Sequence, residues 1–252
     1  MFRTTSTTRF ISKRTFFNVI SDTAGTVVDK QCLGPLVSLE HTLKQVKICM
    51  PKDLLLQNMG ISKKLHIQEI MRDPYFVDQW KFRYNQPPDF DLFYGLFCRN
   101  MVKFVPEYSV FIPGALEMIR WLNNNDTTFI RLTTNYPNFM GKLVLKKMRD
   151  QGLPEDVKLH CFGDGFQTLA GGIKEIIKES DSRCRSVIVG DTPTNMYAAP
   201  NNSLKVGVVE TSALYNGKNK NEVIQILENS GASITINSFN DILNVLNKRY
   251  HG

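Results

Sequence analysis

Ser-Asp-Thr-Ala-Gly-Thr-Val-Val-Asp, at positions 21–29, is the stretch of sequence that decides the fold. It overlaps the end of a run of β-branched and aromatic side chains at positions 15–21, which predicts a buried strand. That run stops at Asp22, in an acidic turn that contains Gly25. An acidic side chain at the carboxyl end of a buried first strand is typical of an α/β protein with a ligand site at that edge of its sheet.

Beyond position 110 the chain alternates between helical and strand patterns. The predicted strands are 128–133, 157–162, 187–189 and a final one at 205–209, and the predicted helices include 139–149, 171–179, 222–229 and 239–246. This alternation implies right-handed crossovers and a parallel sheet. Thr134 and Asp191 then fall at carboxyl ends of strands, as Asp22 does, and ligands bind at that edge.

Residues 33–110 have a helical pattern throughout and interrupt this alternation. Leu36, Leu39, Leu43 and Val46 recur at helical spacing, and further helices are predicted at 61–71, 75–84 and 90–102. We therefore expect a basic leader at 1–15, an α/β core at 16–32 and 111–252, and an inserted helical cap at 33–110.

The composition fits such a core. A chain of 252 residues with 42% apolar content can bury a full core and one insertion. No apolar run approaches the ~20 residues that a bilayer requires, so no membrane span is predicted. The five cysteines contain no C-x-x-C pair, which argues against a disulfide framework and a zinc site and favours a reducing compartment.

The net charge of +7 is concentrated at the start of the chain. Arg3, Arg9, Lys13 and Arg14 supply four of these charges, and the rest is an ordinary excess for a folded domain. No motif interleaves aromatic and basic residues, which argues against direct nucleic-acid binding. The leader is rich in Ser and Thr, as mitochondrial transit peptides are. It predicts a mitochondrial protein, and a plain flexible tail on a cytoplasmic protein is the alternative.

The polar groups at the predicted strand ends suit phosphoryl transfer. Asp22 would attack phosphorus and form an aspartyl phosphate. Asp22, the backbone carbonyl of Ala24 and Asp191 would hold Mg²⁺, a hard cation that prefers oxygen ligands. Thr134 and Asn135 would hold a phosphoryl oxygen. Each of these residues alone could merely cap a loop, but their occurrence at successive strand ends favours a site.

The run at 21–29 resembles the first motif of the haloacid dehalogenase superfamily, in the form found in phosphonoacetaldehyde hydrolases (phosphonatases). Most phosphatases of the superfamily have a second Asp two residues after the nucleophile, where it protonates an alkoxide leaving group. Here that position is Ala24. An enzyme that breaks a carbon–phosphorus bond releases a carbon leaving group instead. The resemblance implies a Rossmann-like parallel sheet with an inserted helical cap.

Residues 58–66 are similar to the phosphonatase cap segment. By that resemblance Lys63 forms an imine with an aldehyde substrate and His66 shuttles protons, since residues three apart share a helix face. The resemblance also assigns substrate contacts to Thr26, Cys32, Met59 and Tyr136. It implies a small phosphonate substrate, Mg²⁺ as cofactor, and a homodimer. Without the family, Lys63 and His66 would be interpreted as a solvated helix face.

Two positions depart from the family pattern. The family has a Lys or Arg before the helix of its third motif, where this chain has residues 166–170 without a cation, and the nearest one, Lys174, falls inside the predicted helix. The last motif ends in Asn195 instead of Asp. Losing a positioned cation costs about a thousandfold in phosphoryl transfer. Two hypotheses follow: a weakened phosphonatase-like hydrolase, or a catalytically degenerate subunit of a mitochondrial assembly such as a ribosome or a membrane complex.

Overall fold

A computed structural model describes residues 15–165 and 168–250. Its centre is a six-stranded parallel sheet with the strand order β3-β2-β1-β4-β5-β6. The strands are β1 (Phe16–Asp22), β2 (Thr128–Thr134), β3 (Leu159–Cys161), β4 (Cys184–Gly190), β5 (Leu204–Val208) and β6 (Ile234–Ile236). The prediction of an α/β fold with a parallel sheet is confirmed.

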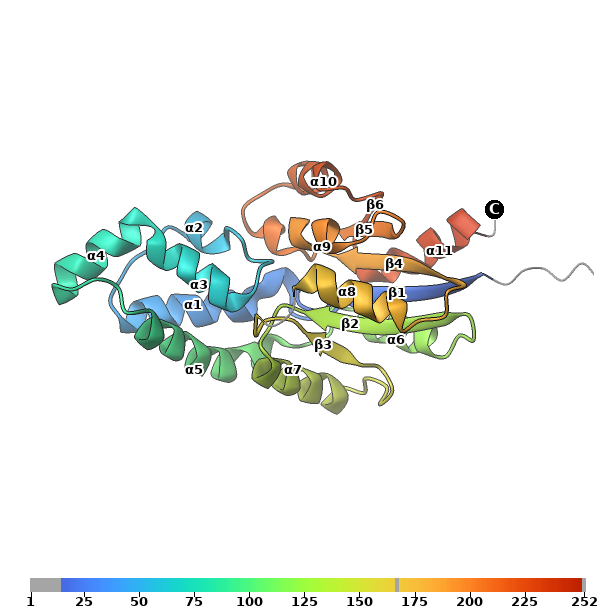
Figure 1. Cartoon of the computed structure of the whole chain (residues 1–252), viewed down its shortest axis with the longest axis horizontal. Coiled ribbons are helices and arrows are strands. Elements are labelled where there is room, and N and C mark those ends of the chain that lie inside the picture. The colour runs from blue at the N-terminus through green and yellow to red at the C-terminus, as the bar shows by residue number, and fades with distance from the viewer. Residues whose placement is uncertain (1–14, 166–167, 251–252) are drawn as a thin grey trace, which may run out of the picture.

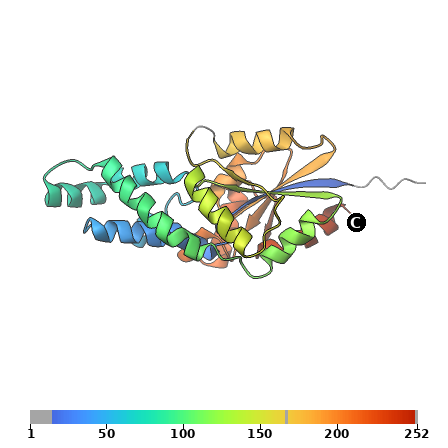
Figure 2. The ribbon, with the colours of Figure 1, turned by 90° about the horizontal axis from the view of Figure 1, so that it is seen from below.

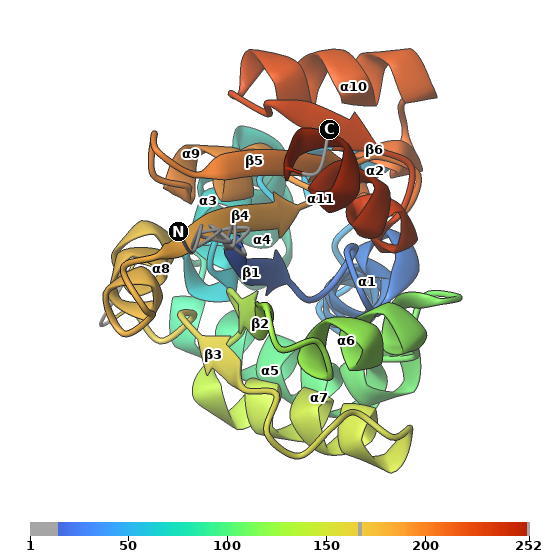
Figure 3. The ribbon, with the colours of Figure 1, turned by 90° about the vertical axis from the view of Figure 1, so that its right-hand side faces the viewer.

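Helices cover both faces of the sheet. They are α6 (Ala115–Asn123), α7 (Asn138–Asp150), α8 (Leu169–Lys178), α9 (Pro193–Ala198), α10 (Lys220–Asn229) and α11 (Ile242–Tyr250). Figure 3 shows α8 and α9 on one side of the sheet and α6 and α11 on the other. Alternate strand residues point to opposite faces, so Ile20 and Ile188 pack under α8 and α9, whereas Val19 and Val187 belong to the main core.

The segment 33–108 forms five helices beyond the carboxyl ends of the strands, to one side of the sheet in both Figure 1 and Figure 2. They are α1 (Leu33–Gln45), α2 (Lys52–Leu56), α3 (Lys63–Arg72), α4 (Pro74–Tyr84) and α5 (Phe90–Tyr108). Phe76, Trp80 and Phe93 are fully buried among them, and the rings of Phe76 and Phe93 meet edge to face at 5.1 Å. This aromatic cluster gives the helical part an apolar interior of its own.

Several predicted boundaries were wrong. The strand at 204–208 is not the last, because β6 pairs with it, and three residues are too few to show a strand pattern. Helix α5 continues six residues past the predicted end at 102 and includes Pro106. Proline usually ends a helix, but here it lies in the last turn. The short helices α2 and α9 were not predicted.

In the described ranges, no helix combines the length and the apolar character that crossing a membrane requires. The predicted leader at 1–15 lies outside the described residues except for Thr15. Phe166 and Gln167, in the segment where the family has its cation, also lie outside them.

Candidate active site

A small cavity lies where the carboxyl ends of β1, β2 and β4 meet the helical part. Its lining residues are Asp22, Ala24, Cys32, Pro35, Met59, Gly60, Lys63, Thr134, Asn135, Tyr136, Asp191 and Thr192. Its volume is about 30 Å³, which is room for about one or two water molecules. The structure therefore brings together most of the predicted site residues around one small cavity. Thr26 and His66 do not line this cavity.

The Asp22 carboxylate is held by two hydrogen bonds at the end of β1. Its Oδ1 accepts from the backbone N–H of Thr23 and its Oδ2 from the Nδ2 of Asn195, each at 2.8 Å. Burial raises the pKa of Asp22 to about 6, although both hydrogen bonds and the nearby Lys63 oppose the shift. A half-buried carboxylate that is held in one orientation suits a nucleophile.

Asn195 is fixed by the turn that begins α9. Its Oδ1 accepts from the backbone N–H of Thr192 at 3.1 Å and from the Thr192 hydroxyl at 2.7 Å. These two donors place the carbonyl oxygen of the side-chain amide on Thr192, so the NH₂ group must face Asp22. The sequence indicated only that an acid was missing at position 195. It gave no sign that the amide would become a donor to the nucleophile.

Asp191 is the second carboxylate that lines the cavity, together with Asp22. Its Oδ2 accepts from the backbone N–H of Ala213 at 3.0 Å, and its Oδ1 accepts from the Thr26 hydroxyl at 3.4 Å. Burial, followed by the charge of Asp22, raises the pKa of Asp191 to about 8. Gly25 has a φ of 77°, and a Cβ there would lie 2.3 Å from Asp191 Oδ2, so glycine is needed for this close approach. Thr26 thus contacts Asp191 without lining the cavity.

The acidic pair fits a divalent cation. Asp22 and Asp191 offer carboxylate oxygens, and Ala24 of the same cavity offers a backbone carbonyl. The charge of Asp22 opposes the ionisation of Asp191, and a bound cation would relieve this repulsion. Oxygen ligands of this kind suit Mg²⁺.

Lys63 brings an amine from the helical part into the cavity. Its side chain is 4% exposed, its Nζ donates to the carbonyl of Met59 at 2.7 Å, and it lies 5.9 Å from the ring centre of Tyr136. Burial lowers the pKa of Lys63, opposed by Cys32, Asp22 and other acids. A lowered pKa increases the share of neutral amine, the form that attacks carbonyl groups. In the described part of the chain, Lys63 is the one cationic side chain that lines the cavity.

Neither His66 nor Lys174 joins Lys63 in the cavity. His66 is buried one helical turn along α3 and lines a separate pocket of about 50 Å³. Its Nε2 has no hydrogen-bond partner, and burial together with the charge of Lys63 lowers its pKa to about 3. Lys174 is exposed on α8, so it does not replace the missing cation.

The remaining lining residues connect the two parts of the molecule. Asn135 donates its Nδ2 proton to the carbonyl of Gly60 at 2.7 Å, so this amide is used to hold the helical part against the sheet. The Thr134 hydroxyl accepts from the backbone N–H of Tyr136 at 3.2 Å. The Tyr136 hydroxyl is buried without a hydrogen-bond partner, and burial raises the pKa of the Cys32 thiol. A substrate entering this site would find the Tyr136 hydroxyl free to form a hydrogen bond with it.

Comparison with known proteins agrees with this geometry. No family profile matches the chain. Phosphonoacetaldehyde hydrolase from Paraburkholderia xenovorans strain LB400 is 28% identical over 250 residues, which cover 90% of this chain and 93% of that protein. Phosphonoacetaldehyde hydrolase from Bacillus cereus strain B4264 is 26% identical and covers 90% of this chain and 94% of that protein.

Solved structures show the same fold. A phosphonoacetaldehyde hydrolase-like protein from Oleispira antarctica aligns with a TM-score of 0.80 at 19% identity, over 98% of this chain and 96% of that one. A haloacid dehalogenase-type protein from Bacillus subtilis, described as bound to magnesium, aligns with a TM-score of 0.58 at 15% identity, over 92% of this chain and 99% of that one. The chain has the fold of the haloacid dehalogenase-type hydrolases. Its sequence is similar to that of phosphonoacetaldehyde hydrolases over most of its length.

Proposed function

We propose that this protein hydrolyses phosphonoacetaldehyde or a closely related small phosphonate by breaking its carbon–phosphorus bond. One observation carries the proposal: the Lys63 amine and the Asp22 carboxylate line the same cavity. Ala24 supports it, because the acid that a phosphatase needs for an alkoxide leaving group is absent from this position.

The proposed chemistry begins at the amine. Neutral Lys63 adds to the substrate aldehyde and loses water to form an imine. Asp22 then attacks phosphorus, the carbon–phosphorus bond breaks, and its electron pair moves into the imine to give an enamine. Protonation and hydrolysis of the enamine release acetaldehyde and restore Lys63, while water hydrolyses the aspartyl phosphate to phosphate. His66 is proposed to exchange protons with this amine when the helical part opens, since in the present arrangement it lines a separate pocket.

Mg²⁺ held by Asp22, Ala24 and Asp191 would reduce the repulsion between the anionic nucleophile and the anionic substrate. A cavity of about 30 Å³ is too small for a phosphonate with its aldehyde arm. Turnover therefore requires the helical part to move away from the sheet and return, as caps and lids do in other enzymes. The contact between Asn135 and Gly60 must break in each cycle.

A second candidate function is that of a catalytically degenerate subunit in a mitochondrial assembly. Two observations favour it: the small volume of the cavity, and the presence of Lys63 as the one cationic lining residue in the described ranges. A protein clamped in an assembly would keep the fold and have no need to open. Purification of the native protein separates the two candidates, because the enzyme should be recovered free, as a small homodimer, and the subunit only with a large complex.

Trapping the imine tests the proposed function. The full-length protein is incubated with phosphonoacetaldehyde and borohydride, and mass spectrometry should find the reduced adduct on Lys63. Lys63→Arg should abolish the adduct, whereas Lys64→Arg, at the neighbouring exposed lysine, should leave it unchanged. Asp22→Ala should keep the adduct but release no phosphate. An adduct spread equally over surface lysines, or none on Lys63, would show that the imine mechanism is wrong.

A further inference from the structure

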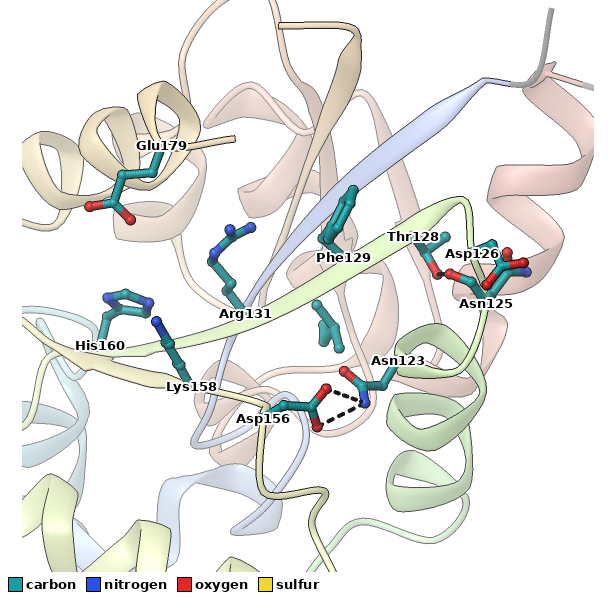
Figure 4. Close-up of a pocket in the computed structure, with 11 residues that line it drawn as sticks. Asn123, Asn125, Asp126, Thr128, Phe129, Arg131, Asp156, Lys158, His160 and Glu179 are labelled. Carbon is teal, nitrogen blue, oxygen red and sulfur yellow. Dashed lines mark hydrogen bonds between the residues drawn. The ribbon is translucent and has the colours of Figure 1, made fainter. Parts of the chain in front are cut away.

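A second cleft, of about 330 Å³, lies over β2 and β3 and shares no lining residue with the active-site cavity (Figure 4). It lies on the face that α8 and α9 cover, because Arg131 donates to the side-chain oxygen of Asn18 at 2.7 Å, and Asn18 points to the same side as Ile20. The two helices pack over β1 and β4. They leave this face of the sheet open over β2 and β3, where the cleft lies.

Two cationic side chains stand side by side in this cleft. Leu132 pairs with Leu159 and Thr133 with His160, so Arg131 lies next to Lys158, the residue just before β3. Like charges opposite each other on neighbouring strands destabilise a sheet. The ion pairs found among the described residues involve neither Arg131 nor Lys158. The fold thus keeps two like charges side by side, and no carboxylate among the described residues forms an ion pair with either of them.

His160 adds a third group to the same end of the cleft. Its Nε2 is buried and has no hydrogen-bond partner. Burial and the charges of Arg131 and Lys158 lower its pKa, while Glu179 opposes the shift. An anion placed among these three side chains would pair with both cations and favour a proton on the imidazole.

The acidic residues of the cleft do not fill this position. Asp156 is turned to Asn123, whose Nδ2 donates to both of its oxygens at 3.0 Å, and Asp126 lies on the far side (Figure 4). Glu179 is exposed just after the end of α8 and can turn to solvent. Phe129, two residues before Arg131 on the same face, leaves 45% of its surface exposed beside the cations.

We infer that this cleft is a second binding site, for a small organic phosphate or phosphonate. The oxyanion is held by Arg131, Lys158 and His160 through charge-assisted hydrogen bonds. The organic part of the ligand lies on Phe129, in a volume that exceeds the need of a bare phosphate ion.

Histidine NMR of the full-length protein tests this inference with phenylphosphonate, which cannot be hydrolysed as an ester, and with inorganic phosphate. Phenylphosphonate should shift the His160 resonances saturably and raise the pKa of His160. His66, beside the active site, reports binding there separately. Lys158→Gln and Arg131→Gln should each raise the Kd read at His160 about tenfold or more. Lys146→Gln, the same charge change on exposed α7, should not.

Phe129→Ala should remove the preference for phenylphosphonate over inorganic phosphate without preventing the binding of either. The inference is wrong if His160 does not respond, or if Lys158→Gln binds as tightly as Lys146→Gln. Arg131→Gln loses the contact to Asn18 and could be unstable for that reason. Lys158 is exposed, so Lys158→Gln leaves the packing intact and decides the test by itself. Equal affinity of the two ligands in the unmodified protein would overturn the role of Phe129.

Discussion

Asn195 donates a hydrogen bond from its Nδ2 to Oδ2 of Asp22 at 2.8 Å, across 173 positions of sequence. The position that is acidic in the family pattern is thus a neutral donor to the nucleophile in this chain. A neutral amide is a weaker partner for a carboxylate than a cation is, but it orients the carboxylate and needs no counter-charge. The missing cation at 166–170 and the amide at Asn195, the two departures from the family pattern, are therefore compatible with each other in one site.

Asn195→Asp should impair this arrangement although it restores the family's residue. The new carboxylate would keep its contact to Thr192 and present an oxygen to Asp22, which raises the pKa of Asp22 further. We expect phosphate release from phosphonoacetaldehyde at neutral pH to fall about a hundredfold or more. Borohydride trapping on Lys63 should persist, since the amine reacts first. Asn201→Asp, at an exposed turn, is the control, and equal rates for both variants would contradict the prediction.

Asp191 should make the metal-free protein less stable as the pH rises. Its pKa is raised to about 8, so the folded state binds a proton that the unfolded state, with a pKa near 3.8, has already lost. The free energy of unfolding should therefore fall between about pH 4 and pH 8, relative to Asp191→Asn. Urea unfolding of both proteins in a chelator measures this difference. A difference that is constant with pH would contradict it.

Magnesium should reverse that loss of stability. A cation that binds the ionised pair of Asp22 and Asp191 stabilises the folded state by mass action, and more strongly at pH 8 than at pH 5. Urea unfolding with saturating Mg²⁺ should show the gain in the unmodified protein, and a chelator should remove it. Asp191→Asn should show little or no gain. An equal gain in this variant would place the cation elsewhere.

Gly60→Ala should prevent the helical part from closing over the sheet. A Cβ at position 60 would lie 2.5 Å from the Thr192 hydroxyl oxygen, closer than real Cβ contacts allow. We expect turnover to fall at least about tenfold, with faster hydrogen exchange around positions 58–61. Gly95→Ala is a matched control, because a Cβ there meets nothing within 4 Å, and it should stabilise α5 by about 0.5–1 kcal/mol.

His66 should remain neutral throughout the range in which the enzyme would work. Burial and the neighbouring Lys63 lower its pKa to about 3. Its imidazole resonances should show no titration between pH 5 and pH 8, and the pH–rate profile should have no limb that disappears in His66→Asn. A titration midpoint near 6.5 would mean that the pocket around His66 is open to water.

Much of the fold could be predicted from local patterns. The strand that ends at Asp22 and the alternation after position 110 are properties of adjacent residues, so they predicted the parallel sheet correctly. The strand β6 was not predicted, because three residues are too few to show the alternation of apolar and polar side chains that marks a strand. The continuation of α5 through Pro106 was not predicted, because proline lacks the N–H that a helix needs and usually marks a helix end.

What the sequence determined by itself is the chemistry available to the site: a carboxylate at Asp22, no acid at Ala24, an amine at Lys63 and an amide at Asn195. Only the tertiary structure decided how these groups are used. It turned the Asn195 amide to Asp22, kept His66 out of the shared cavity and narrowed that cavity to about 30 Å³. It also placed Arg131, on β2, beside Lys158, just before β3. The physical reason is that side-chain direction and solvent access depend on packing between segments far apart in the chain, which residue identity and spacing do not specify.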